Sequence, residues 1–179
     1  DPDFIVLRYN DLFSLDESVK TSQVPVINAG CGTLEHPTQA LLDAFTIWEK
    51  KQSLEGEKVL IVGDVGHSRV ANSNLKLLSR LGAEVAICAP AEMMPHKEAW
   101  QSVKKFSHMK DATAWASACM GLRVQLERHQ DEGLEKALEN YRENYRLDNK
   151  NLSALSASAL IMHPGPFVPG IDFAVETLN

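Results

Sequence analysis

Residues 58–89 read KVLIVGDVGHSRVANSNLKLLSRLGAEVAICA, in which two apolar runs flank a stretch with helical spacing. The first run, Lys58–Val62, leads through a glycine turn into Ser68–Leu81, where the apolar residues fall on one face of a helix. Gly82 follows at the position where a glycine commonly ends a helix, and Glu84–Ala89 is the second run. A strand, a helix and a strand in this order predict a parallel α/β sheet.

The same alternation continues toward both ends of the chain. Four further apolar runs are predicted to be strands: Phe4–Leu7, Pro25–Asn28, Ala118–Val124 and Ala159–His163. Three further stretches are predicted to be helices: His36–Lys51, Pro95–Phe106 and Asp131–Tyr145. We therefore expect an α/β protein with doubly wound parallel sheets, and a domain boundary in the polar segment Lys50–Lys58.

The composition is that of an ordinary soluble globular protein, with 179 residues of which 44% are hydrophobic and 23% charged. The formal net charge of -6 argues against nucleic acid or an anionic membrane as a partner, and no apolar run approaches the ~20 residues of a membrane span. Cys31, Cys88 and Cys119 are far apart, which indicates reduced thiols in the cytoplasm and neither a disulfide frame nor a metal site. Because the chain begins at Asp1 with no initiator Met, we expect a fragment of a longer protein.

A first candidate ligand site lies in residues 28–43, which read NAGCGTLEHPTQALLD. A strand ends, a glycine-bearing loop follows, and a helix begins with Pro37 in its first turn. His36 and Gln39 are three residues apart, so they share a face at the positive end of that helix, which suits an anionic or carbonyl-bearing ligand. An imidazole there is expected to stay neutral and to donate one hydrogen bond. Taken alone, a His before a Pro is more often a simple helix cap.

A second candidate lies in residues 62–73, VGDVGHSRVANS, where a strand, a glycine turn and a helix follow one another. The spacing is not G-x-G-x-x-G, and no acidic residue ends the next strand, which argues against a nicotinamide dinucleotide site. Arg69 falls in the first turn of the helix, where the helix dipole disfavours a cation. An anionic ligand therefore explains Arg69 better than a structural role does.

Two further segments place polar groups at strand ends. In MGLRVQLER, residues 120–128, Arg123 and Gln125 are two apart, so in an extended chain their side chains point the same way. In IMHPGP, residues 161–166, a strand runs into a rigid Pro-Gly-Pro turn that exposes backbone carbonyls and can hold a cis X-Pro bond.

Four of these motifs together resemble the family of aspartate carbamoyltransferase catalytic chains. They are HPTQALLD at 36–43, HSRV at 67–70, LRVQLER at 122–128 and HPGP at 163–166, in the order and at the separations of that family. The resemblance extends over essentially the whole chain. Thr38 and Gly165 fit the aspartate enzymes better than the related ornithine enzymes, which carry other residues there.

The resemblance implies transfer of a carbamoyl group from carbamoyl phosphate to L-aspartate in pyrimidine biosynthesis, with no metal, cofactor or covalent intermediate. Carbamoyl phosphate would be held by Arg8, His36, Gln39, Gly165 and Pro166, with Arg8 and His36 donating to the carbonyl oxygen and the others engaging the carbamoyl amine. The carboxylates of aspartate would be held by Arg69, Arg123 and Gln125. The alternatives are a non-catalytic homologue that acts as a scaffold, or a carbamoyltransferase for another amino acid.

The family is built from two α/β domains and assembles as a homotrimer with sites between subunits, in some cases with a regulatory chain or dihydroorotase. Carried over, residues 1–51 are the end of the carbamoyl-phosphate domain, 52–158 the aspartate domain and 159–179 a return segment. A Ser-x-Arg-Thr-Arg phosphate loop, a lysine-bearing loop and a C-terminal helix of the family are not in the chain, so the fragment alone is predicted to be inactive. Gly66 and Asn72 stand where the family often has basic residues, and Pro169 stands where it has an arginine.

Overall fold

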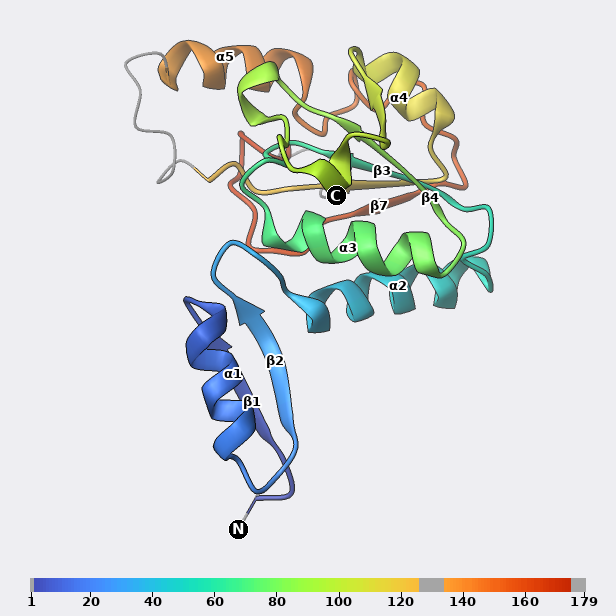
Figure 1. Ribbon diagram of the computed structural model, residues 1–179. Helices are drawn as coiled ribbons and strands as arrows, with labels where there is room; N and C mark the ends of the chain where they lie inside the picture. Colours follow the sequence, from blue (N-terminus) through green and yellow to red (C-terminus); the bar gives the residue numbers. More distant parts are fainter. Residues whose placement is uncertain (1, 126–133, 175–179) are drawn as a thin grey trace.

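The N-terminal segment forms a small unit of its own in the computed structural model, which describes residues 2–125 and 134–174. Strands β1 (Ile5–Tyr9) and β2 (Val26–Cys31) pair in parallel, with Ile5 opposite Val26, and helix α1 (Leu12–Thr21) connects them. The side chain of Asp11 caps α1 by accepting from the Ser14 N–H at 2.7 Å. Figure 1 shows this unit, in blue, beside the larger part of the molecule.

The larger part is a five-stranded parallel sheet with the strand order β5-β4-β3-β6-β7. Its strands are β3 (Lys58–Val62), β4 (Glu84–Cys88), β5 (Lys104–Phe106), β6 (Ala118–Gly121) and β7 (Leu160–Met162). Helices α2 (Pro37–Lys51) and α3 (Arg69–Arg80) cover one face, and α4 (Met109–Trp115) and α5 (Leu134–Asn144) cover the other, as Figure 1 shows. Two short 3-10 turns, η1 (Ala91–Met93) and η2 (Glu98–Trp100), lie between β4 and β5. The predicted doubly wound parallel architecture is confirmed.

The apolar runs at β3 and β6 correspond to strands that are buried on both faces. On β3, Val59 packs with residues of α2 and α3 such as Ile47 and Leu78, whereas Leu60 and Val62 pack on the opposite side with residues that include α4. A strand covered on both sides needs apolar residues at every position, which explains the unbroken Val59–Val62 run. In the described part of the chain, no helix is both long enough and apolar enough to cross a lipid bilayer.

Part of the predicted secondary structure is wrong. The helix predicted over Pro95–Phe106 is instead η2 followed by the edge strand β5, which pairs with β4. The free edge of β4 supplies backbone partners for this strand, and Trp100 is buried in the core, so tertiary contacts override the helical pattern. Helices α1 and α4 were not predicted. The helix predicted over Asp131–Tyr145 is present as Leu134–Asn144, and residues 131–133 lie outside the described residues.

The strand predicted over Ala118–Val124 ends earlier, at Gly121. Beyond it, the backbone N–H of Val124 donates to Asp172 Oδ1 at 3.0 Å, and that of Gln125 donates to Asp64 Oδ2 at 3.1 Å. Two buried carboxylates therefore replace the sheet as acceptors and turn the chain toward the carboxyl end of β3, where parallel sheets bind ligands.

Candidate functional site

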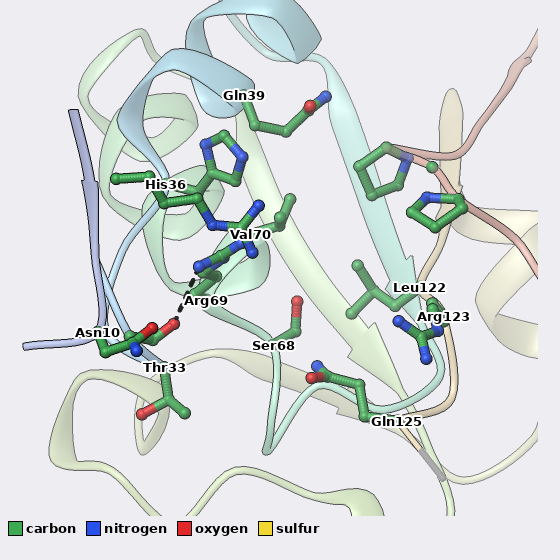
Figure 2. A pocket seen from close by; sticks show the side chains of 15 residues that line it. Asn10, Thr33, His36, Gln39, Ser68, Arg69, Val70, Leu122, Arg123 and Gln125 are labelled. Atoms are coloured by element: carbon green, nitrogen blue, oxygen red, sulfur yellow. Dashed lines mark hydrogen bonds between the residues drawn. The ribbon is translucent and has the colours of Figure 1, made fainter. Parts of the chain in front are cut away.

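All eight residues predicted to bind ligand line one pocket of about 600 Å³. The pocket opens where the carboxyl ends of β3, β6 and β7 meet the loops that follow β1 and β2. Figure 2 shows His36 and Arg69 next to one another, with Arg123 and Gln125 across the opening from them. The eight residues are Arg8, His36, Gln39, Arg69, Arg123, Gln125, Gly165 and Pro166.

His36 occupies the N-cap position of α2, but its side chain makes no capping hydrogen bond. The interpretation of His36 as a simple helix cap is therefore wrong. Its backbone N–H donates to Ser73 Oγ at 2.8 Å, and its Nδ1 lies 3.3 Å from Thr38 Oγ1. Partial burial lowers the pKa of His36, and the nearby charges of Arg69 and Arg8 lower it further. The imidazole is therefore neutral near pH 7, as the sequence predicted.

Arg69 is the first residue of α3, and its guanidinium lies against the loop that follows β2. Its Nη1 donates to the Gly32 carbonyl oxygen at 3.2 Å. Gly32 has a φ of 49°, and a Cβ at this position would collide with the Asn10 carbonyl oxygen. The absence of a side chain at Gly32 therefore lets the loop after β2 pack against the backbone at Asn10.

The first two turns of α3 hold this loop in place. Asn72 Nδ2 lies 3.3 Å from the Thr33 carbonyl oxygen and 3.2 Å from that of Leu34, and Ser73 Oγ accepts from the His36 N–H. Trp100 Nε1 donates to Asn72 Oδ1 at 3.1 Å, which orients the amide. Asn72, noted in the sequence as a departure from a basic residue, therefore docks the loop that carries His36.

Across the pocket, Arg123 and Gln125 lie on the loop after β6. Gln125 Nε2 donates to the His67 carbonyl oxygen at 2.8 Å, and the Gln125 backbone N–H donates to Asp64. The other oxygen of Asp64 pairs with His67 Nδ1 at 2.6 Å. The fully buried Asp64 thus fixes both the Gln125 backbone and the segment to which its amide is bound.

The Pro-Gly-Pro turn presents its backbone to the same pocket. The Gly165–Pro166 bond is cis, which agrees with the prediction that this turn can hold a cis X-Pro bond. The N–H of Gly165 donates to His163 Nδ1 at 2.9 Å, and Asp172 Oδ2 accepts from the Val168 N–H at 2.6 Å. Asp64, Asp172 and the supporting role of His163 were missed, because nothing in the local sequence indicates which backbone a distant carboxylate will bind.

The lining of the pocket is positively charged. Three arginines, Arg8, Arg69 and Arg123, contribute to it, and none of the described residues that line it is acidic. Such a site attracts anions in a protein whose net charge is negative. Within residues 2–125 and 134–174, no cluster of His, Cys, Asp or Glu has the arrangement of a metal site.

Comparison with known proteins identifies matching families over almost the whole chain. The model of the Asp/Orn binding domain of aspartate/ornithine carbamoyltransferase matches residues 55–177, and that of its carbamoyl-P binding domain matches residues 2–49. The aspartate carbamoyltransferase catalytic subunit of Acetivibrio thermocellus is 45% identical over 177 residues, covering 99% of this chain and 56% of the relative. That of Deinococcus radiodurans is 41% identical, covering 99% and 56%. The chain thus spans little more than half the length of these curated relatives.

Solved structures share the fold. Aspartate transcarbamoylase from Trypanosoma cruzi in complex with phosphate superposes with a TM-score of 0.80 at 23% identity, covering 97% of this chain and 59% of that one. The same enzyme with aspartate and phosphate gives a TM-score of 0.77 at 24% identity, covering 96% and 55%.

Proposed function

Because the chain belongs to the aspartate/ornithine carbamoyltransferase family, we propose that it forms part of an aspartate carbamoyltransferase. The full-length enzyme, meaning a polypeptide of the curated relatives' length that carries this chain, transfers the carbamoyl group of carbamoyl phosphate to L-aspartate. The products are N-carbamoyl-L-aspartate and phosphate, in de novo pyrimidine biosynthesis. The identity with aspartate carbamoyltransferase catalytic subunits supports aspartate over ornithine as the acceptor.

Arg8 and His36 bind the carbonyl oxygen of carbamoyl phosphate. In this scheme the neutral imidazole carries its proton on Nε2, which donates to the ligand, and its Nδ1 accepts from the Thr38 hydroxyl 3.3 Å away. Attack on the carbonyl carbon places negative charge on this oxygen. Donors that are already oriented before the reaction stabilise that charge at little cost in reorganisation.

The amine of the carbamoyl group binds to acceptors on the opposite side. Gln39 supplies a side-chain oxygen, and the carbonyl oxygens of Gly165 and Pro166 supply backbone acceptors. These acceptors favour an N–H2 group over a methyl group or a deprotonated oxygen, because neither of the latter donates a hydrogen bond. The φ of 69° at Gly165 and the His163 hydrogen bond hold the turn in a fixed direction.

Aspartate binds through Arg69, Arg123 and Gln125. A guanidinium suits each carboxylate because it is permanently charged and donates in a forked geometry. With both carboxylates held, the amine nitrogen attacks the carbamoyl carbon and the bond from that carbon to the bridging phosphate oxygen breaks. The leaving phosphate takes the proton released by the amine. No cofactor or metal takes part in this scheme, so catalysis depends on positioning and electrostatics.

The organisation of the enzyme is part of the same proposal. Residues 1–51 complete the carbamoyl-phosphate domain, 52–158 form the aspartate domain, and 159–179 return toward the first. The family resemblance supports a cytoplasmic homotrimer, alone or in a larger assembly with a regulatory chain or dihydroorotase. The phosphate and lysine loops then come from the part of the relatives' length that this chain does not span.

The observation that carries the proposal is that eight residues from well-separated segments line one cationic pocket. Steady-state assays of the full-length enzyme with carbamoyl phosphate and either aspartate or ornithine test it. We expect carbamoylaspartate from aspartate and no product from ornithine. Absence of turnover with every amino acid would instead support the scaffold, and efficient use of another amino acid would identify a different acceptor.

A further inference from the structure

Gln39 is held by a carboxylate that lies behind the pocket. Gln39 Nε2 donates to Asp43 Oδ1 at 2.9 Å, one helical turn along α2, where residues four apart lie on the same face. Asp43 is buried, with 4% of its surface exposed, and is not among the residues that line the pocket. An amide has its nitrogen and oxygen on opposite sides of one carbon. Because the nitrogen is bound to Asp43, the oxygen Oε1 is the group left for the pocket.

The second oxygen of Asp43 is also occupied. Asn74 Nδ2, on α3, donates to Asp43 Oδ2 at 2.7 Å, and the same nitrogen lies 3.7 Å from Met120 Sδ. Turning the Asn74 amide over would place its oxygen against a carboxylate oxygen and a sulfur, so its orientation is fixed. Asp43 thus accepts from both amides at once, one through each of its carboxylate oxygens.

We infer that Asp43 is a positioning residue that orients the Gln39 amide, so that the pocket offers a hydrogen-bond acceptor and selects a ligand with an N–H group beside its carbonyl. The inference rests on the proposed function and adds to it a source of selectivity. Carbamoyl phosphate has such an N–H2 group, and acetyl phosphate, which has a methyl group in its place, does not. A site built to accept from an N–H leaves its acceptor unpaired when the methyl analogue binds.

The substitution Asp43→Asn separates orientation from mere packing, because it keeps the shape of the side chain and leaves a single acceptor oxygen. We expect Asn74 to keep that oxygen, because its Nδ2 also lies against Met120 Sδ, so the new amide nitrogen faces Gln39 and donates to Oε1. Gln39 then turns over and presents Nε2 to the pocket, where it opposes the N–H2 of the ligand. The double variant Asp43→Asn/Asn74→Asp reverses this, because the carboxylate at position 74 takes the amide nitrogen of residue 43 and returns the oxygen to Gln39.

The measurement is the ratio of the dissociation constants for acetyl phosphate and carbamoyl phosphate, from calorimetry on the full-length enzyme. We expect the wild type to prefer carbamoyl phosphate by about tenfold or more, Asp43→Asn to lose about tenfold of that preference, and the double variant to recover it. Asn74→Leu is the matched control, since it removes the other bond to the same carboxylate. It should lower the melting temperature and leave the ratio unchanged.

An unchanged ratio in Asp43→Asn, or an equal loss of affinity for both phosphates, would overturn the inference. If Asp43→Asn does not fold, NMR of the wild type can test the orientation through the side-chain amide proton signals of Gln39. These signals are assigned from their loss in Gln39→Ala. They should move little when carbamoyl phosphate binds, because Nε2 stays on Asp43, and a large shift would reject the orientation. A wild type that binds carbamoyl phosphate with this preference but makes no product would reject only the proposed reaction.

Discussion

Acid should destabilise the full-length enzyme through His163, which is buried next to the Pro-Gly-Pro turn. Its side chain is 7% exposed, and its Nδ1 accepts from the Gly165 N–H. Burial lowers the pKa of His163 from 6.5 to about 4. The unfolded chain therefore takes up this proton near pH 6.5, whereas the folded protein takes it up only near pH 4. As the pH falls between these values, the unfolded state gains stability relative to the folded state.

The size of the effect follows from the shift. The pKa of His163 differs by about 2.5 units between the unfolded and the folded state, from 6.5 to about 4, and each unit corresponds to roughly 1.4 kcal/mol. The free energy of unfolding should therefore fall by about 3 kcal/mol between pH 7 and pH 4. This is an upper limit, because Asp172 Oδ2, 3.9 Å from His163 Nε2, would attract an imidazolium. His163→Gln is the comparison, because an amide oxygen can still accept from Gly165 but does not titrate.

The assay is urea denaturation of both proteins at several pH values from 7 to 4. All other titrating groups are shared, so the difference between the two stability curves isolates His163. The difference should change by up to about 3 kcal/mol, with the wild type losing more stability toward low pH. If the two proteins lose stability in parallel, the imidazole is not held neutral by burial and the reasoning fails.

Three further predictions concern the proposed reaction. In the full-length enzyme, His36→Ala should lower kcat by about 10²–10³ and change aspartate binding much less, because in the proposed reaction the imidazole donates to the developing oxyanion. Stopped-time product assays measure kcat, and an unchanged kcat would contradict this role. Arg123→Ala should raise the KM for aspartate steeply, because leaving a substrate carboxylate unpaired costs about 2–5 kcal/mol of binding free energy. The affinity for carbamoyl phosphate should stay constant, and equal weakening of both substrates would contradict this assignment. The 179-residue chain alone should form no carbamoylaspartate, because the phosphate and lysine loops of the family lie outside it, and measurable product from the purified chain would refute that.

The sequence was most informative where a feature depends on neighbouring residues. The buried strands Lys58–Val62 and Glu84–Cys88 and the helices α2 and α3 follow from apolar spacing, Pro37 and Gly82, all of which act locally. The neutral His36 at a helix start and the position of Arg69 in a first turn follow in the same way. Several of the predicted site residues follow strands of the five-stranded parallel sheet, at its carboxyl edge, and the others come from the segments at β1 and β2.

The tertiary structure alone decided the contacts that join distant parts of the chain. Strand β5 forms because β4 has a free edge, although its own sequence favoured a helix. Asp64 accepts a hydrogen bond from the Gln125 backbone, 61 positions away in the sequence, and Asp43 accepts one from Asn74, 31 positions away. A buried carboxylate binds whichever N–H groups the packed helices and loops bring to it, and that choice has no local signature. The sequence thus indicated which residues line the pocket, because their types and local positions are written in it, and the packing determined which partners orient them.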